Sequence, residues 1–289
     1  MREPVYFGIK HHHFSAESAP ENPWQGKRVL IVGMARSGIA AAELLHSAGA
    51  LVTVNDAKAE ETFGDKLDEL KKLNLVFRLG ENGMDALDNQ DMLIISPGVP
   101  IDAPIVKKAE MMRIPVLGEM EMAARFIKSD MVAVTGTNGK TTTVSLLGAI
   151  FREAGKLCYV AGNIGYPLSA AAMLAQKEDM VVVEVSSFQL ETTKNFHPLS
   201  AAVLNVTEDH LNRHGTMEVY TGLKKHIFDA QSHKDYAVLN YEDEACREMA
   251  DELGSHVLYF SRLHEVPEGA FVRDGQIVWR LNGEEKVIC

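Results

Sequence analysis

The stretch from Met131 to Phe151 constrains the fold of this chain more than any other part. The apolar residues Met131 to Val134 predict a buried strand, and the pattern from Val144 to Phe151 predicts a helix. Between them lies the sequence Gly136-Thr-Asn-Gly-Lys-Thr-Thr142. Such a strand-to-helix turn presents backbone N–H groups and the positive end of the helix dipole to an anion. The sequence therefore predicts an α/β fold with an anion-binding turn at this point.

The residues of this turn favour a nucleoside triphosphate as the anion. Lys140 supplies a mobile positive charge for the outer phosphates, and the Thr141 hydroxyl suits a magnesium ion. The spacing departs from the common phosphate loop, G-x-x-x-x-G-K-[ST], because Val134 stands where the first glycine is expected. The alternative is a tight strand-to-helix turn with a surface lysine. That alternative gives no reason for Lys-Thr to follow directly after Asn-Gly.

Length, charge and cysteine content limit the class of protein. A chain of 289 residues accommodates two ordinary domains. A net charge of −11 argues against a general nucleic-acid binder, so local donors must hold any anionic ligand. The 3 cysteines are far apart and form no C-x-x-C pair, which indicates reduced thiols and a cytoplasmic location. No apolar run approaches the ~20 residues that a membrane span requires.

The first 22 residues are interpreted as a peripheral leader. They contain proline, serine and glutamate and follow neither a helical nor a strand period. We expect a disordered leader or an added tag here. The alternative for His11-His12-His13 is a metal-binding tract. No function is assigned to this segment.

The next hundred residues predict a parallel sheet. A strand at 27–32, a helix from Ile39 to about Ala48 and a strand at 51–56 form a β-α-β unit. Gly33 and Gly38 bracket the turn after the first strand. Asp56 follows Gly33 by 23 positions, where a Rossmann acidic residue meets a ribose. This unit is therefore a candidate nucleotide site.

Two features refine that site. Ala35 stands where the dinucleotide fingerprint requires its middle glycine, which weakens a reading of the unit as an NAD site. A single nucleotide held by Asp56 and the turn remains open, as does a plain α/β packing unit. Ser96 and Gly98 follow a predicted strand at 91–95, so we expect them in the same crevice beyond the strand ends. The boundary of this domain is placed near Gly118.

A buried acid marks the second half of the chain. The run Asp179–Leu190 reads as a buried strand with a polar end, and Glu184 interrupts its apolar residues. A buried unpaired carboxylate is expensive, so a cation partner is expected. Magnesium beside Thr141 is one candidate and a structural salt bridge is the alternative. A glycine turn that carries Asn163 precedes this run.

Further polar residues follow later strands. A strand at 201–206 leads into Thr207-Glu-Asp-His210, so His210 is a candidate metal ligand, although a loop histidine is often inert. Residues from Tyr220 to about Ser232 have a helical pattern that contains Lys224 and Lys225. Composition alone does not choose between these two lysines. Asp274-Gly275 predicts a β-hairpin between strands at 271–273 and 276–280.

Taken together, these motifs resemble the Mur ligases, the ATP-dependent amide-forming enzymes of peptidoglycan synthesis. The resemblance runs from about Trp24 to the end of the chain. The loop at 136–142 is shared with the wider superfamily, including folylpolyglutamate synthetase, whereas the segments at 184–190, 33–38 and 96–98 resemble the D-glutamate-adding branch. The resemblance implies a Rossmann-like UDP-substrate-binding domain at 23–118. A P-loop-type α/β ATPase domain with a mostly parallel sheet is implied at 119–289.

The resemblance also implies a role for each candidate residue. ATP would be held by Gly136, Thr137, Asn138, Gly139, Lys140, Thr141 and Thr142. Thr141 and Glu184 would bind one Mg²⁺, and His210 would bind a second, bridged by a carbamylated lysine. The family pattern Tyr-x-x-x-Lys-x-x-Ile corresponds to Tyr220, Lys224 and Ile227, which selects Lys224. Asn163, Ser186 and Gln189 would face the sugar-peptide substrate, and Gly33, Asp56, Ser96 and Gly98 the UDP moiety.

The implied reaction joins two substrates at the expense of ATP. The carboxylate of UDP-N-acetylmuramoyl-L-alanine is phosphorylated, and the amine of D-glutamate attacks the resulting acyl phosphate to release phosphate. Magnesium and Lys140 would offset the repulsion between the carboxylate and the γ-phosphate. Lys140, Glu184, His210 and Lys224 are thus the expected catalytic residues. We expect a cytoplasmic monomer.

Two departures from the family pattern affect these expectations. Asn212 stands where aspartate is usual, and little consequence is expected. Such ligases also carry a third, C-terminal domain and a Gly-x-His-Asn-x-x-Asn segment, neither of which precedes Cys289. We expect a fragment that binds the UDP-substrate but ligates poorly. The alternatives are another Mur or folylpolyglutamate-type ligase and a nucleotide-binding module without catalysis.

Overall fold

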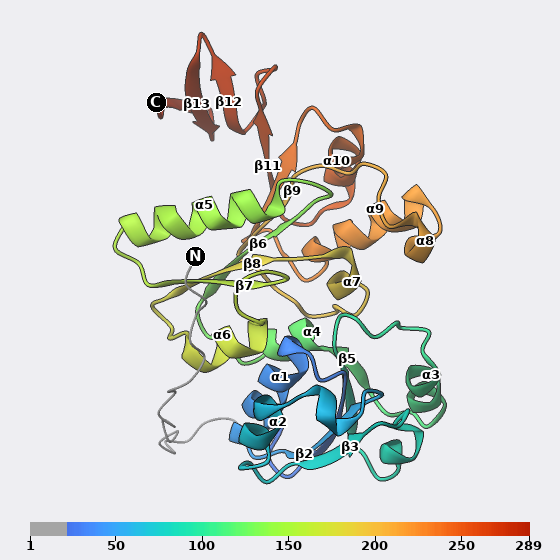
Figure 1. Ribbon diagram of the computed structural model, residues 1–289. Coiled ribbons are helices and arrows are strands. Elements are labelled where there is room, and N and C mark those ends of the chain that lie inside the picture. The colour runs from blue at the N-terminus through green and yellow to red at the C-terminus, as the bar shows by residue number, and fades with distance from the viewer. Residues whose placement is uncertain (1–21) are drawn as a thin grey trace.

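The computed structural model describes residues 22–289, which form two successive α/β units (Figure 1). Apart from residue 22, the predicted leader and its histidine tract lie outside the described residues. The first unit is built on a five-stranded sheet and the second on a nine-stranded sheet. Within the described part of the chain, no helix is both long and apolar enough to cross a membrane. The expected α/β class with parallel sheets is confirmed.

The first sheet is wholly parallel, with strand order β3-β2-β1-β4-β5. The first strand lies at its centre because its apolar side chains are covered on both faces. The chain order places the glycine turn after β1 at the carboxyl edge, next to the ends of β2 and β4. The elements are β1 (Arg28–Val32), α1 (Arg36–Ser47), β2 (Leu51–Asp56), α2 (Asp65–Leu70), β3 (Val76–Leu79), β4 (Met92–Ile95), α3 (Pro104–Met111), β5 (Val116–Gly118) and α4 (Glu119–Ala124).

The second sheet has the order β14-β13-β12-β11-β10-β9-β6-β8-β7, parallel up to β12 and antiparallel from there to β14. Its interior strand β6, the third from the β7 edge, leads into the glycine turn predicted from the sequence. The elements of this part are β6 (Asp130–Thr135), α5 (Lys140–Glu153), β7 (Cys158–Gly162), α6 (Leu168–Leu174), β8 (Met180–Glu184), α7 (Ser187–Leu190), β9 (Ser200–Val203), α8 (Leu211–His214), α9 (Met217–Lys225), β10 (Tyr236–Asn240), α10 (Glu244–Met249), β11 (His256–Ser261), β12 (Gly269–Arg273), β13 (Gln276–Leu281) and β14 (Glu284–Val287).

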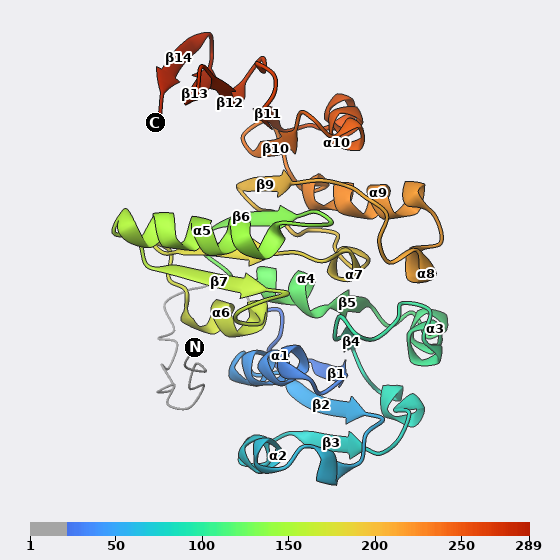
Figure 2. The ribbon, with the colours of Figure 1, turned by 45° about the horizontal axis from the view of Figure 1, so that its top comes forward.

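Three helices join the two units. Helices α1, α4 and α6 lie between the sheets in both ribbon views, and one continuous apolar core extends from one sheet to the other (Figure 2). The ring of Trp24 stacks on Phe126 across this junction, with centroids 5.4 Å apart. The buried Glu119 carboxylate of α4 accepts hydrogen bonds from the Ser169 N–H and hydroxyl, at 2.8 and 2.6 Å. The junction is therefore a packed interface with satisfied polar groups.

Several predicted elements have other bounds in the structure: the helix expected from Ile39 begins at Arg36, and the strand expected over 201–206 ends at Val203. The strand expected over 179–190 ends at Glu184, and residues Ser187–Leu190 form a helical turn. The reason is a capping box, in which the side chains of Ser186 and Gln189 each accept from the other's backbone N–H. The helix expected from Tyr220 to about Ser232 instead spans Met217–Lys225, with a 3₁₀ turn after it. Thr216 caps its start by accepting from the Val219 N–H.

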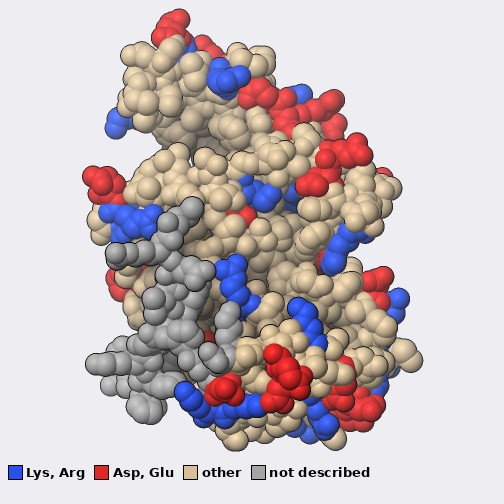
Figure 3. All heavy atoms as spheres, viewed as in Figure 1, with Lys and Arg blue, Asp and Glu red and all other residues tan. Residues whose placement is uncertain are grey.

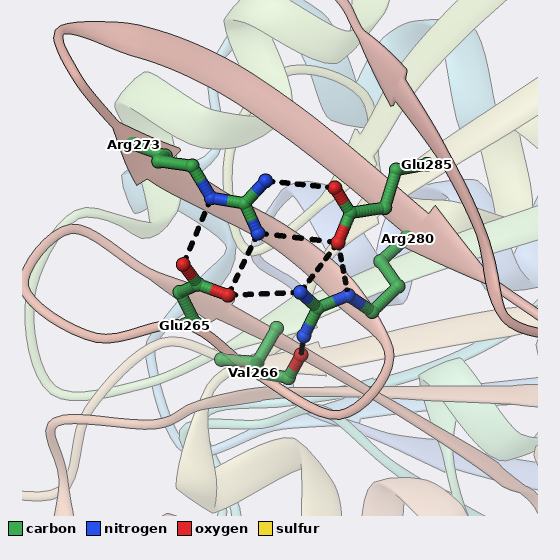
Figure 4. A network of polar contacts seen from close by, with 5 residues as sticks. All are labelled: Glu265, Val266, Arg273, Arg280 and Glu285. Carbon is green, nitrogen blue, oxygen red and sulfur yellow. Dashed lines mark hydrogen bonds and ion pairs between the residues drawn. The ribbon is translucent and has the colours of Figure 1, made fainter.

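The hairpin predicted at Asp274-Gly275 is confirmed. Strands β12 and β13 pair antiparallel, with Arg273 opposite Gln276, and Asp274 and Gly275 have φ values of 51° and 77°. An ion-pair network crosses this hairpin and its neighbour (Figure 4). Its members are Glu265, Arg273, Arg280 and Glu285, joined by guanidinium–carboxylate bonds, with Arg280 also donating to the Val266 carbonyl.

Candidate active site

The turn after β6 has the geometry of a phosphate-binding loop. Gly136 and Gly139 have φ values of 149° and 86°, which side-chain-bearing residues rarely adopt. A Cβ on Gly136 would also lie 3.0 Å from the Cβ of Leu204. Helix α5 begins at Lys140, directly after the turn, so its free N–H groups face outward from the carboxyl edge of the sheet. Thr142 lies in the first turn of this helix and is exposed.

The loop is held by the segment that follows β9. The Asn205 side-chain amide accepts from the Asn138 N–H at 2.8 Å and donates to the Asn138 carbonyl at 3.0 Å. The Thr137 hydroxyl donates to the Thr207 carbonyl and accepts from the Thr207 N–H. Asn205 was not among the predicted site residues. The strand expected over 201–206 contained this residue, whereas β9 ends at Val203, so the sequence pattern gave no signal for its role.

Three predicted residues meet at the start of α5. The Thr141 hydroxyl donates to Glu184 Oε2 at 2.7 Å, and Asn163 Nδ2 donates to Glu184 Oε1 at 2.8 Å. Lys140 Nζ folds back over the loop and donates to the carbonyls of Gly136 and Thr137, both at 2.8 Å. The loop lysine, the threonine hydroxyl and a buried carboxylate therefore lie around one turn.

The surroundings of Glu184 fit a divalent cation. The residue is 1% exposed, and its two oxygens accept from a hydroxyl and an amide. Within residues 22–289, no lysine, arginine or histidine lies within ion-pair distance of this carboxylate, so the alternative of a structural salt bridge is not observed. A buried carboxylate that has only neutral donors gains most from a cation, and oxygen donors of this kind are those that Mg²⁺ prefers.

Lys224 is a buried amine on α9, next to the loop. The residue is 1% exposed, and its Nζ lies 4.4 Å from the centroid of the Tyr220 ring. Burial, together with the positive charge of Lys140, lowers the pKa of Lys224 to about 7. The Tyr220 hydroxyl lies 3.4 Å from the Thr137 hydroxyl. Tyr220 therefore contacts both Lys224 and the phosphate loop. By contrast, Lys225 is half-buried and pairs with Glu252.

His210 lies at the beginning of α8 in a left-handed conformation, with φ of 52°. Its ring packs on Phe188, with centroids 5.0 Å apart, and its Nε2 is 3.4 Å from a carboxylate oxygen of Asp209. The described residues contain no group of three or more histidine, cysteine, aspartate or glutamate side chains arranged to hold a metal. The structure thus brings together Thr141 and Glu184, and it connects Lys224 to the loop. It places His210 beside α7.

The second predicted site forms a cleft of about 480 Å³ at the carboxyl edge of the first sheet. Residues from both units line it, including six that were predicted from the sequence. Ser186 is not part of the lining, since its side chain caps α7. The predicted residues in the lining are Gly33, Asp56, Ser96, Gly98, Asn163 and Gln189.

Asp56 organises the turn on the first-unit side of the cleft. Its carboxylate accepts from the backbone N–H of Met34 at 2.7 Å and of Lys58 at 2.9 Å. The Ser96 hydroxyl donates to the Gly33 carbonyl at 2.9 Å, which ties the ends of β1 and β4 together. Arg36, the first residue of α1, also lines the cleft and was not predicted. A cation at the first position of a helix after a glycine turn is the signal that would have identified it.

Basic side chains occupy the middle of the molecule on the face seen in Figure 3, between the two units, despite the net charge of −11. Arg36 and Lys58 line the cleft, and Lys140 stands at the phosphate loop. Such local positive charge attracts anionic ligands even when the whole protein is acidic.

The fold and this site define a phosphate-loop α/β protein with a second cleft beside a Rossmann-like sheet. Residues 27–118 match the family model for the Mur ligase MurD-like N-terminal domain, and residues 134–283 match that for the Mur ligase middle domain. The chain therefore belongs to the Mur ligase family.

Relatives of known name agree with this assignment. The chain is 46% identical over 265 residues to a UDP-N-acetylmuramoylalanine--D-glutamate ligase from Koribacter versatilis (strain Ellin345), covering 91% of this chain and 58% of that protein. It is 43% identical over 260 residues to the protein of the same name from Geobacter sp. (strain M21), covering 90% and 58%. The chain thus spans somewhat over half the length of these curated relatives.

Solved structures show the same fold at low sequence identity. The UDP-N-acetylmuramate:L-alanyl-gamma-D-glutamyl-meso-diaminopimelate ligase from Neisseria meningitides superposes with a TM-score of 0.60 at 19% identity, covering 90% of this chain and 86% of that chain. A murein peptide ligase from Psychrobacter arcticus 273-4 gives a TM-score of 0.59 at 14% identity, covering 91% and 61%. At these identities the likeness concerns the fold alone.

Proposed function

We propose that this chain provides the UDP-substrate-binding and ATP-binding parts of a ligase that joins D-glutamate to UDP-N-acetylmuramoyl-L-alanine in peptidoglycan synthesis. The observation that carries the proposal is the position of Asn163. Its side chain lines the cleft, and its Nδ2 donates to Glu184, which in turn accepts from Thr141 of the phosphate loop. A substrate in the cleft and a nucleotide at the loop would therefore be separated by the bonded side chains of Asn163 and Glu184. The names of the relatives supply the substrates.

The phosphate loop is the proposed ATP site. The N–H groups of residues 136–142 and the N-terminus of α5 would bind the phosphates. Lys140, which now donates to two loop carbonyls, would turn to the outer phosphates, and its charge would offset the repulsion between the γ-phosphate and the substrate carboxylate. Transfer of the γ-phosphoryl group to that carboxylate gives an acyl phosphate and ADP. Attack by the D-glutamate amine then releases phosphate.

Thr141 and Glu184 are the proposed residues for one Mg²⁺, and His210 and Lys224 for a second. When bound, Mg²⁺ would supply positive charge to the phosphate oxygens during transfer. Asn163 would keep the Glu184 carboxylate oriented, because it holds the oxygen that Thr141 does not contact. His210 would be held by its packing on Phe188.

Lys224 is the proposed site of carbamylation. A pKa of about 7 leaves a large share of the amine neutral at physiological pH, and the neutral amine is the form that adds CO₂. The neutral amine forms an N–C bond to CO₂ and releases one proton, which leaves a carbamate anion; counted from the ammonium, two protons are lost. That change removes the repulsion between Lys224 and Lys140 and supplies an oxygen ligand. The ring of Tyr220 would position the modified side chain.

The cleft is the proposed UDP-substrate site. Residues 23–118 would then form the UDP-binding domain and residues 119–289 the ATP-binding domain of a cytoplasmic, monomeric protein. Gly33, Ser96 and Gly98 leave the backbone accessible to the diphosphate, and Arg36 and Lys58 add positive charge. Asp56 would accept from the ligand while it holds the turn. Ser186 and Gln189 would serve the peptide end, with Ser186 acting through the cap of α7.

The test is a binding and turnover panel on the purified chain. We expect binding of UDP-N-acetylmuramoyl-L-alanine and of ATP–Mg²⁺, with weaker binding of UDP-N-acetylmuramate. Any phosphate release from ATP should depend on D-glutamate. Greater release with L-alanine, a diamino acid, or glutamate plus a folate would assign the chain to another ligase of the family. Binding of UDP but no binding of ATP–Mg²⁺ would reduce it to a nucleotide-binding module.

A further inference from the structure

A buried histidine outside the proposed ligand set connects the cleft to the phosphate loop. His214 ends α8 and is 7% exposed. Its Nε2 lies 3.0 Å from the Ser187 hydroxyl of α7, and its Nδ1 lies 3.5 Å from Glu191 Oε1. Its ring stacks on Tyr220 of α9, with centroids 5.4 Å apart and planes 23° apart. One side chain therefore contacts both α7 and α9.

Each of these contacts leads to a different ligand site. On one side, Ser187 belongs to α7, and Gln189 of the same helical turn lines the cleft. On the other side, Tyr220 lies under Lys224 Nζ and places its hydroxyl 3.4 Å from the Thr137 hydroxyl of the loop. Helices α7 and α9 also contact each other directly, and Asn163 and Glu184 form a separate bridge from the cleft to Thr141. The ring of His214 is the packed connection that reaches Tyr220 and, through it, Thr137.

One hydrogen bond and one facing carboxylate orient the ring. Burial lowers the pKa of His214, so the imidazole is neutral and one nitrogen carries the proton. Glu191 faces Nδ1, which favours the proton on that nitrogen and leaves Nε2 to accept from the Ser187 hydroxyl. The Glu191 carboxylate is itself held by the guanidinium of Arg213. A ring held by Ser187 at Nε2, with the Glu191 carboxylate facing Nδ1, can set the plane of the tyrosine that stacks on it.

The set Ser187, His214 and Glu191 has the composition of a nucleophilic triad, but its environment excludes that role. Ser187 is 4% exposed, so no substrate carbonyl can reach its hydroxyl. The Nδ1–Oε1 separation of 3.5 Å is longer than a good hydrogen bond, and the carboxylate is already bound to Arg213. The arrangement suits support of neighbouring groups.

We propose that His214 is a positioning residue that couples occupancy of the cleft to binding at the phosphate loop. A substrate that engages Gln189 stabilises α7 in this position, and the bond from Ser187 to His214 carries that constraint to Tyr220, Lys224 and Thr137. This inference rests on the proposed function, since it takes the cleft ligand to be a UDP-linked muramoyl peptide and the loop ligand to be ATP–Mg²⁺. The coupling is reciprocal, so each ligand raises the affinity for the other by the same factor.

The experiment measures that factor by calorimetry on the full chain. The affinity for ATP–Mg²⁺ is determined with and without saturating UDP-N-acetylmuramoyl-L-alanine, for wild type, Ser187→Ala, His214→Phe and the double variant. We expect coupling of at least about fivefold in wild type. In both single variants it should fall to within about twofold of unity, with no further loss in the double variant because both changes remove the same bond. His233→Phe, at an exposed position, is the matched control and should keep the wild-type factor.

The outcomes separate this inference from the proposed function. A wild-type chain that binds neither ligand overturns the proposed function and the coupling with it. A chain that binds both ligands but shows no coupling, or keeps its coupling in Ser187→Ala, overturns the role of His214 alone. Ser187→Ala removes one hydroxyl and is the milder change, so it decides the question if His214→Phe does not fold. Loss of coupling at an unchanged melting temperature separates positioning from general destabilisation.

Discussion

The two glycine turns of this molecule have the same strand-turn-helix arrangement but differ in the charge of the side chain that holds the turn. Each follows an interior strand that pairs in parallel with both of its neighbours, and each leads into a helix whose first residue is a cation, Arg36 in α1 and Lys140 in α5. At the first turn, the N–H of Met34 is bonded to the carboxylate of Asp56. At the second, the N–H of Asn138 is bonded to the neutral amide of Asn205.

If the two turns bind the two proposed ligands, this difference explains how one motif suits both. A carboxylate within the turn lowers its attraction for phosphate but offers an acceptor for sugar hydroxyls, as acidic residues do in Rossmann folds. A turn held by a neutral amide keeps its full positive field for a triphosphate. The carboxylate nearest the second turn is that of Glu184, which contacts the turn through the Thr141 hydroxyl. A cation can therefore lie between this carboxylate and bound phosphates. The predictions below test whether the first turn binds the UDP-substrate and the second binds ATP.

The largest effect is expected for Lys140→Ala. Charge-assisted hydrogen bonds to phosphate are worth about 1.5–3 kcal/mol, so the affinity for ATP–Mg²⁺ should fall by roughly 100-fold. The affinity for the UDP-substrate should stay within about twofold. Calorimetric titration of both ligands checks this, with Lys156→Ala, at an exposed lysine beyond the end of α5, as the control. Equal loss of both ligands would remove the distinction between the two turns.

Gly38→Ala should break the first turn and leave the second intact. A Cβ at this position would lie 1.8 Å from the Gly33 carbonyl oxygen, so the turn has to open. We expect a loss of roughly 1–3 kcal/mol in the free energy of unfolding and loss of UDP binding. The control is Gly222→Ala in α9, where a Cβ meets nothing within 4 Å and helix propensity should make the change neutral or stabilising. Denaturant unfolding provides the measurement, and wild-type UDP affinity in Gly38→Ala would contradict the account.

Lys224 should make the free energy of unfolding depend on pH above neutrality. Its pKa is about 7 in the folded chain and near 10.5 when unfolded, so between these values the unfolded state binds more protons. The free energy of unfolding should therefore rise with pH across this window, by up to about 1.4 kcal/mol per unit. Lys224→Met removes this slope and should be more stable than wild type near pH 7. Denaturation in CO₂-free buffer tests this, and parallel curves for the two proteins would contradict it.

Asp56→Asn should weaken the UDP site without touching ATP binding. The amide keeps one acceptor oxygen, so one of the bonds to Met34 and Lys58 is retained and the charge is lost. We expect about a tenfold lower affinity for the UDP-substrate, about 1.4 kcal/mol. Asp68→Asn, at an exposed position of α2, provides the control. If Asp56→Asn strengthened UDP binding, the carboxylate would be an obstacle and not a ligand.

The smallest effect is expected far from both turns. Glu285→Gln removes one charge from the exposed network of Glu265, Arg273, Arg280 and Glu285 (Figure 4). Exposed ion pairs contribute little and are screened by salt. The melting temperature should fall slightly at low ionic strength, and the difference from wild type should vanish at high salt. Neither ligand affinity should change, and a change in either would mean that the hairpin communicates with a site.

The sequence predicted the strand-turn-helix units because their signals are local. Glycine at a left-handed position, an apolar strand before it and a helical pattern after it occur within one short segment, as at Gly136 and Gly33. The Ser186–Gln189 turn was missed as a helix because an apolar strand pattern ran straight into it. The capping box that ends the strand requires two side chains, which periodicity does not register.

The supporting residues of the site could not be found in the same way. Asn205 holds the loop from a neighbouring strand, and His214 stacks on Tyr220 from another helix. Their partners are distant in sequence or hidden by burial, and nothing in residue type distinguishes them from loop residues. Arg36 and Lys58 join the cleft only because β1 and β2 are paired in register. Such contacts follow from the packing of elements and not from any single segment.

The most direct test of the two-turn account is native mass spectrometry of the purified chain with UDP-N-acetylmuramoyl-L-alanine and ATP–Mg²⁺ together. The account predicts a ternary complex with one molecule of each ligand, reduced to the UDP-substrate complex alone in Lys140→Ala. Displacement of one ligand by the other in the wild-type chain would mean that the two compete for one site, and would contradict it.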